Sequence, residues 1–239
     1  MGDPCEKSTK VPDIGPGCAE VAPGVFLDGR LALHHREEGW LAISDLHFGY
    51  EVSRRRDGGL WPMWGMETIT ERLRALVEEL QPRTLILVGD IVDSSGAANE
   101  ALKWLSKIHQ LCDSTILIKG NHDRGEVTRQ FPFVPSFETG SYFFHHGHLP
   151  LFEEKKASQS GLIEIIGHWH PSIRFEDGAG TSLKLPAMTM EELPKHSASR
   201  WILPAFSPWA GGVKYQPGKS AIQFRQWACS TTRVFEVPS

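Results

Sequence analysis

Five short motifs carry most of the side chains that could do chemistry. In chain order they read SDLHFG (44–49), GD (89–90), GNHD (120–123), HGH (146–148) and GHWH (167–170). They offer carboxylates, imidazoles and one amide, but no thiolate. This choice of donors is typical of a divalent metal bound through nitrogen and oxygen. The motifs together therefore predict a metal site.

Each motif follows a short apolar run that predicts a β-strand. These runs are Trp40 to Ser44, Thr84 to Val88, Thr115 to Lys119, Tyr142 to His145 and Leu162 to Ile166. Ligands of open α/β sheets usually bind beyond the carboxyl ends of the strands. Residues two apart point to the same side of an extended chain, which applies to Asp45 with His47 and to His168 with His170. We expect the polar residues to meet at one rim.

Any one motif has an ordinary explanation. A single Asp-x-His is more often a helix cap or a turn, and Gly-Asp is common turn chemistry. Coincidence is a poor explanation for all five motifs, and their donors exceed what one ion uses. Two ions that share a carboxylate fit better, and such pairs serve displacement at phosphorus. The candidate ligands are Asp45, His47, Asp90, Asn121, one histidine near position 146, His168 and His170.

The segments between the motifs predict an α/β fold. Apolar residues recur with helical spacing from Met66 to Gln81 and again from Asn99 to Leu111, between predicted strands. Strands that alternate with helices predict a largely parallel sheet. After residue 140 the helical period fades and short apolar runs predict a second, mostly antiparallel sheet. Two stacked mixed sheets flanked by helices would place the strand ends at one rim.

Composition limits the class of protein. A chain of 239 residues fits one domain, 1–239, with residues 1–22 as a loose extension or an edge strand. The net charge of -4 gives no general electrostatic attraction to nucleic acid or to a membrane surface. The four cysteines form no C-x-x-C pair, which disfavours a zinc knuckle or a disulfide framework. Since no signal peptide or membrane span is evident, we expect a soluble, cytoplasmic protein.

The ordered set SDLHFG, GD, GNHD, HGH and GHWHP, at 44–171, resembles the signature of the calcineurin-like metallophosphoesterases. The resemblance implies a four-layer α-β-β-α sandwich with a binuclear centre. It implies that Asp45, His47 and His170 hold the first metal, and that Asn121, His146 and His168 hold the second. Asp90 would bridge the two ions, and His122 would be the catalytic histidine.

A narrower resemblance is to the bacterial DNA-ligase-associated phosphoesterases related to the SbcD nuclease. It rests on SDLHFGYE followed by RRRDGG, and on LPAFSPWAGG at 203–212. It implies a DNA substrate, a setting in DNA repair and a ligase partner. Three departures leave the substrate open: Tyr50, Asp93 and Ala210 stand where Lys, His and Thr are frequent.

The expected function is a binuclear phosphodiesterase in which a metal-bridging hydroxide attacks phosphorus and His122 protonates the leaving oxygen or stabilises its charge. We expect a DNA endonuclease or phosphoesterase linked to repair, acting on single-stranded DNA. The alternatives are a phosphodiesterase of small nucleotides or other small phosphoesters, and a non-catalytic scaffold of the same fold. Mn²⁺ is the first choice for both ions, with Fe, Zn, Co and Ni open.

Several neighbours of the ligands are candidates for contacts with a ligand side chain or with the substrate. We expect His148 either to orient a metal ligand or to lie near the substrate, and Arg124 to contact a phosphate. Asp123 either orients the His122 ring or completes the turn. His145 should point away from His146. Trp169, between two ligands, should pack in the core.

One further segment mixes charge with aromatic rings. Arg54, Arg55 and Arg56 precede Trp61 and Trp64. Such a mixture could grip single-stranded nucleic acid. The competing interpretation is a solvated charge run with a hydrophobic staple onto the helix that follows.

Overall fold

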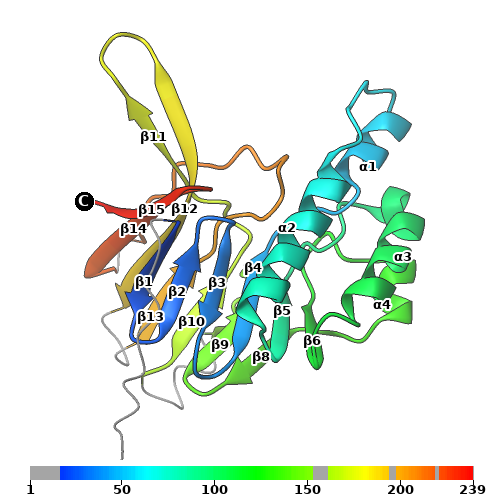
Figure 1. Ribbon diagram of the computed structural model, residues 1–239, viewed down its shortest axis with the longest axis horizontal. Coiled ribbons are helices and arrows are strands. Elements are labelled where there is room, and N and C mark those ends of the chain that lie inside the picture. The colour runs from blue at the N-terminus through cyan, green and yellow to red at the C-terminus, as the bar shows by residue number, and fades with distance from the viewer. Residues whose placement is uncertain (1–16, 153–160, 194–197, 219–220, 239) are drawn as a thin grey trace, which may run out of the picture.

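Two β-sheets stacked face to face form the body of the protein (Figure 1). The computed structural model describes residues 17–152, 161–193, 198–218 and 221–238. The first sheet has the order β1-β2-β3-β4-β5-β6-β7. Its strands are β1 (Cys18–Ala22), β2 (Val25–Asp28), β3 (Ala32–His35), β4 (Trp40–Ser44), β5 (Thr84–Val88), β6 (Ser114–Ile118) and β7 (Phe133–Val134).

The second sheet has the order β15-β14-β12-β13-β10-β9-β8, and β11 pairs with β12 outside this path. Its strands are β8 (Ser136–Thr139), β9 (Tyr142–His145), β10 (Ile163–Ile166), β11 (Ser172–Glu176), β12 (Ser182–Leu193), β13 (Ala198–Ile202), β14 (Gln223–Ser230) and β15 (Arg233–Val237). Parallel pairs join β9, β10 and β13, while the other pairs are antiparallel. In the first sheet the pairs are antiparallel from β1 to β4 and parallel from β4 to β7, so both sheets are mixed, as predicted.

Four helices lie beside the first sheet (Figure 1). They are α1 (Tyr50–Arg56), α2 (Gly65–Leu80), α3 (Ala98–Ile108) and α4 (Glu126–Gln130), with a 3₁₀ turn at Ser95–Ala97. α2 buries Ile69, Leu73 and Leu76 on one face, as its period predicts. It ends at Leu80, because Pro82 disfavours the helical conformation of Gln81, whose φ is 48°. None of the described helices is long and apolar enough to cross a membrane.

Register places the ends of the central strands at one level. Ser44 of β4 pairs with Val88 of β5, and Val88 pairs with Ile118 of β6. Ser44 also forms a parallel bridge with Ala205, just beyond β13 of the second sheet. The residues that follow these strands are therefore brought to one rim shared by both sheets.

Aromatic packing holds the sheets together below this rim. Trp40 of β4 is 2% exposed. Its ring lies 5.1 Å from Tyr142 and 5.2 Å from Phe144 of β9, both edge-on. Edge-to-face pairs at these separations add stability beyond the area that they bury.

At the N-terminal side the structure shows one of the two expected alternatives. Residues 1–22 were expected as a loose extension or an edge strand. Cys18–Ala22 form the edge strand β1, paired with β2, so the loose extension is wrong for that part. Residues 1–16 lie outside the described residues.

Helix α1 was not predicted. Its inward face buries Glu51 and Ser53, whereas Arg54, Arg55 and Arg56 are exposed. Because a polar pair occupies the buried face, the segment lacks the apolar period from which helices are recognised.

His34 of β3 gives the fold a dependence on pH. Its side chain is 8% exposed, and its ring stacks on Phe26 at 5.3 Å. Burial lowers the pKa of His34 to about 4. The nearby Asp28 raises this pKa and Arg36 lowers it, but burial has the largest effect. The imidazole is therefore neutral in the folded chain, and stability is lost as pH falls below the unfolded pKa of about 6.5.

We predict that His34→Phe flattens the acid side of the stability profile. The wild-type free energy of unfolding should fall by about 1–2 kcal/mol more than that of the variant between pH 7 and pH 5. Urea unfolding of metal-free protein at both pH values measures this difference. Parallel losses in the two proteins would show that His34 is not the group that titrates.

Candidate metal centre

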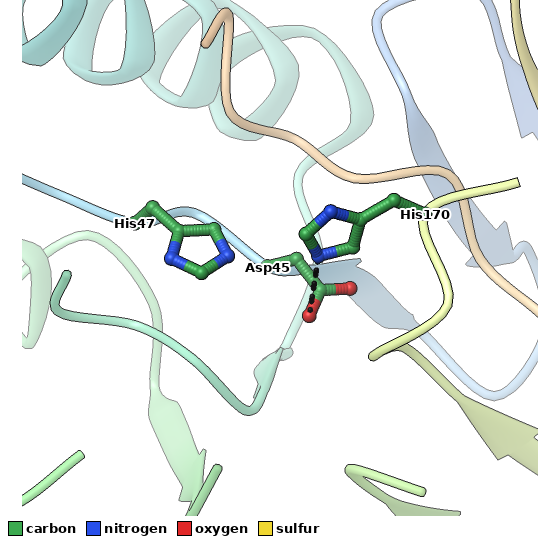
Figure 2. A group of neighbouring side chains, drawn as sticks. All are labelled: Asp45, His47 and His170. Atoms are coloured by element: carbon green, nitrogen blue, oxygen red, sulfur yellow. Dashed lines mark ion pairs between the residues drawn. The ribbon is translucent and has the colours of Figure 1, made fainter. Parts of the chain in front are cut away.

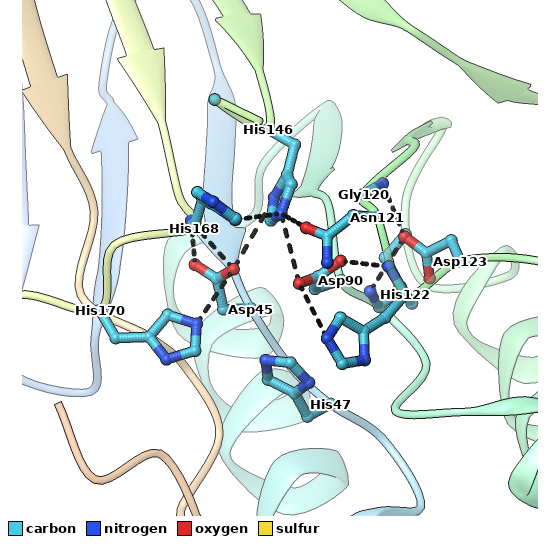
Figure 3. Close-up of polar contacts among 12 residues, drawn as sticks. Asp45, His47, Asp90, Gly120, Asn121, His122, Asp123, His146, His168 and His170 are labelled. Atoms are coloured by element: carbon cyan, nitrogen blue, oxygen red, sulfur yellow. Dashed lines mark hydrogen bonds and ion pairs between the residues drawn. The ribbon is translucent and has the colours of Figure 1, made fainter. Parts of the chain in front are cut away.

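The structure brings all seven predicted ligands together at the rim of the two sheets (Figure 3). Two follow β4, one follows β5 and one follows β6, so the first sheet supplies four. The other three follow β9 and β10 of the second sheet. The ligands are Asp45, His47, Asp90, Asn121, His146, His168 and His170.

Asp45, His47 and His170 form the first group (Figure 2). One donor atom from each lies within 4.8 Å of the others. His170 Nε2 is 3.3 Å from Asp45 Oδ1, and the Asp45 carboxylate is fully buried. His47 Nε2 is also buried and has no hydrogen-bond partner among the described residues. A cation would satisfy both atoms.

Asp90, His146 and His168 form the second group, with Asn121 beside it. His146 Nε2 lies 3.0 Å from Asn121 Oδ1, 3.3 Å from Asp90 Oδ2 and 3.2 Å from His168 Nδ1. Carboxylate oxygens and, as oriented here, the amide oxygen only accept, while Nε2 carries one proton at most. This convergence of lone pairs fits a cation better than it fits hydrogen bonding alone.

Asp90 lies between the two groups. It also gathers with His47 and His122, so its carboxylate faces residues on both sides. Burial raises the pKa of Asp90, but His146 and His122 outweigh it and hold the pKa below the ordinary range of an aspartate. The residue therefore stays anionic and can serve two cations at once.

The chain at these ligands is not extended. Seven non-glycine described residues have a positive φ, and five of them are Asp45, His47, Asp90, His168 and His170, at 45–69°. Such backbone costs energy outside glycine and is concentrated at functional sites. The same-side placement predicted from strand alternation thus arises from left-handed turns.

Close packing explains the glycines of two motifs. A Cβ on Gly89 would lie 2.2 Å from the His146 ring, and one on Gly120 would lie 2.2 Å from Asp90 Oδ1. Any side chain at either position would displace a ligand.

Asp123 holds the loops rather than the His122 ring. Its buried carboxylate accepts the backbone N–H groups of Ile91, Val92 and Gly120. Of the two roles predicted for Asp123, the structure therefore shows the one in which it completes the turn. The His122 ring is oriented instead by a 2.8 Å contact between Nδ1 and the carbonyl of Asp93.

Asp93 was noted in the sequence only as a departure from a pattern. Its Oδ1 lies 3.7 Å from His47 Nδ1, on the side away from the buried Nε2. Burial lowers the pKa of His47, but Asp93, Asp45 and Asp90 together raise it. A carboxylate that orients a ligating imidazole is a common second contact in metal sites. In the sequence, a carboxylate three residues after the candidate ligand Asp90 was the signal from which this contact could have been predicted.

The three clustered histidines have different surroundings. His146 lies in the second group. His148 is half-buried, with its ring 5.1 Å from that of His146, and burial together with His146 and His168 lowers its pKa. His145 is buried and points away, with Nε2 2.8 Å from Glu164.

Trp169 is not in the core, contrary to prediction. Its side chain is 47% exposed, and its ring faces His168 and Tyr215. Alternation applies only to an extended chain, and both neighbouring histidines adopt left-handed backbone.

Arg124 lies at the edge of the site. Its guanidinium donates to the Asn121 carbonyl at 3.3 Å, and it lines an exposed cleft with His122, Arg54 and Ser94. A phosphate could reach both arginines there.

We predict that His145→Ala and His146→Ala separate stability from metal binding. His146→Ala should weaken Mn²⁺ binding at least tenfold, because a donor is lost. His145→Ala should keep the wild-type affinity within about threefold but lose about 2–4 kcal/mol of unfolding free energy, because the buried Glu164 loses a partner. Calorimetric Mn²⁺ titration and urea unfolding measure the two effects. Equal losses of affinity would contradict the assignment.

Three solved structures are similar to this chain, and the first of them shares its fold. The nuclease MPE of Pseudomonas putida is 22% identical, with a TM-score of 0.61, covering 89% of this chain and 94% of that one. A phosphoesterase from E. coli, YfcE, is 16% identical at a TM-score of 0.45, covering 83% of this chain and 97% of its own. A dimetal phosphatase from Danio rerio is 11% identical with a TM-score of 0.41, and the match covers 83% of this chain and 98% of that one. No curated protein matches the chain by sequence.

A family model confirms the resemblance carried by the motifs. The model described as calcineurin-like phosphoesterase matches residues 41–202, more than half of the chain. The matched range begins within β4 and ends with β13, and it contains every candidate ligand. The protein therefore belongs to the calcineurin-like phosphoesterase family.

Proposed function

We propose that this chain is a phosphodiesterase that uses two divalent metal ions. The observation that carries the proposal is the placement of Asp90 between two groups of ligand atoms. Asp45, His47 and His170 would hold one ion, and Asn121, His146 and His168 the other, with Asp90 shared. Mn²⁺ is the proposed metal, since imidazole and oxygen donors accept it. Bound ions would supply positive charge to the phosphoryl oxygens and activate water.

His122 is the proposed general acid. A carbonyl oxygen cannot donate, so its contact with Asp93 requires a proton on Nδ1 and directs Nε2 away from the backbone. Nε2 lies 4.0 Å from Asp90 Oδ2, and the side chain is 39% exposed, so a substrate can reach it. In its imidazolium form the ring also carries a proton on Nε2, which it can give to the leaving oxygen and so become neutral.

The proposed substrate is DNA. The support is the open pocket beside the ligands, which His47, His122 and His170 line together with Tyr50, Arg54 and Trp209. An open pocket accepts a chain that continues in both directions, and Arg54 supplies the positive charge that a phosphate backbone requires. The MPE protein of similar fold is named a nuclease.

The proposed setting is DNA repair in the cytoplasm, beside a DNA ligase. It rests on the similarity of SDLHFGYE and LPAFSPWAGG to the ligase-associated phosphoesterases. His148 and Arg124 would then contact the substrate around the scissile phosphate.

His122→Ala should lower kcat by about 10²–10⁴ while leaving the metal content unchanged, because the ring would contribute proton transfer and no metal donor. Elemental analysis with phosphodiester turnover measures both quantities. Full activity in the variant would remove His122 from the mechanism.

A substrate panel tests the function itself. Metal-free protein titrated with Mn²⁺ should hydrolyse a chromogenic phosphodiester and single-stranded DNA faster than a phosphomonoester. Turnover of the small diester without DNA cleavage would refute the nuclease. No turnover with metal bound would instead favour a scaffold.

A further inference from the structure

An exposed group of aromatic rings borders the candidate metal centre. We call Tyr50, Trp61, Trp64 and Trp209 the aromatic wall. The Trp209 ring lies 4.3 Å from Trp64, 5.3 Å from Trp61 and 6.1 Å from Tyr50. Trp61 is 36% exposed and Trp64 45% exposed. Large rings in such numbers are unusual at a surface and indicate a binding face.

Backbone hydrogen bonds tie the wall to the candidate ligands. Trp209 lies in the loop that follows β13. Ser207 N donates to the carbonyl of Asp45 at 3.1 Å, and Val213 N donates to the carbonyl of His170 at 2.8 Å. Both contacts reach residues of the first ligand group, one from each sheet. The loop that carries Trp209, the ring that the other three contact, is therefore held in place beside the candidate metal centre.

A buried carboxylate fixes the orientation of the wall. Glu51 is fully buried on α1, and its Oε2 accepts the indole N–H of Trp209 at 3.0 Å. Its Oε1 accepts the backbone N–H of Met66, at the start of α2. A Cβ at Gly65 would lie 2.1 Å from Trp209 Nε1, so the ring also packs against backbone. A ring held in this way loses little entropy when a ligand stacks on it.

Two rings of the wall line one pocket with the candidate catalytic groups. Tyr50 and Trp209 line it together with His47, His122 and His170. Trp61 and Trp64 extend the aromatic surface beyond the pocket through their contacts with Trp209. Arg54 lines the same pocket, with its guanidinium 4.7 Å from the centre of the Tyr50 ring. Flat apolar faces beside a cation and a phosphate-directed site match the chemistry of a nucleotide, with its base and its phosphate.

We infer that the aromatic wall stacks an unpaired nucleobase next to the scissile phosphate. This inference rests on the proposed function and assigns the residues that select its substrate. A base within a duplex has both faces covered, so the wall favours a single strand. Stacking tolerates any base, because every base has an aromatic face. Selectivity should thus depend on the presence of a base and not on its identity.

Two strands of equal length test the inference. One is oligothymidylate, and the other has the same backbone with abasic residues throughout. With Mn²⁺ present, wild-type kcat/KM should be about tenfold or more higher for oligothymidylate. Trp61→Leu and Trp209→Leu should bring this ratio towards one, and Trp61→Phe should restore most of it. Leu183→Ala changes a residue that is 56% exposed on β12, outside the pocket, and should keep the wild-type ratio.

The outcomes separate the inference from the function. If the wild-type enzyme cleaves both strands equally, or if both leucine variants keep the wild-type ratio, the wall does not bind a base, and the proposed nuclease still stands. If it hydrolyses the chromogenic diester but cleaves neither strand, the DNA substrate fails and the inference fails with it. Trp61 has no hydrogen bond to Glu51 to lose, so its variants test stacking even if Trp209→Leu unfolds.

Discussion

The rest of the site depends on two buried carboxylates, which need hydrogen-bond donors and positive charge around them. Asp45 is fully buried and Asp90 is 3% exposed, at the junction of the two sheets. An anion in such a place is costly unless it is paired and hydrogen-bonded. The backbone N–H of His168 donates to Asp45, and that of His122 donates to Asp90. The remaining demand is for positive charge, which imidazolium or a bound metal ion can meet.

The strand register explains how so many donors reach these two anions. Residues that follow β4, β5 and β6 start from one level, and the bridge from Ser44 to Ala205 brings in the second sheet. Left-handed turns then direct the side chains inward. Within this arrangement the first sheet supplies the proposed acid, His122, and the loop after β13 supplies the wall residue Trp209.

Behind the site, buried ion pairs hold the second sheet. Glu164 contacts His145 on one side and Arg200 at 2.5 Å on the other, while Glu191 accepts from Tyr215 and lies 4.0 Å from Arg200. Removing one member of such a chain leaves a buried charge without its partner. His145 therefore stabilises the fold, although the next residue in the chain, His146, is a candidate ligand.

The sequence alone determined the order of the motifs, the helices α2 and α3 and the stacked sheets, and these are confirmed together with the family. Short-range periodicity carried this information, since burial on one face repeats along the chain. Roles for individual ligands remain predictions, but the seven residues do meet in space.

Only the tertiary structure decided the rest. Trp169 lies at the surface because its neighbours turn left-handed, and α1 hides a polar face that has no apolar period. The Asp123 carboxylate holds the backbone at Val92, 31 residues earlier in the chain. The wall joins Trp61 to Trp209, far apart in sequence. Such contacts depend on sheet register and loop closure, and no local pattern of residues encodes either.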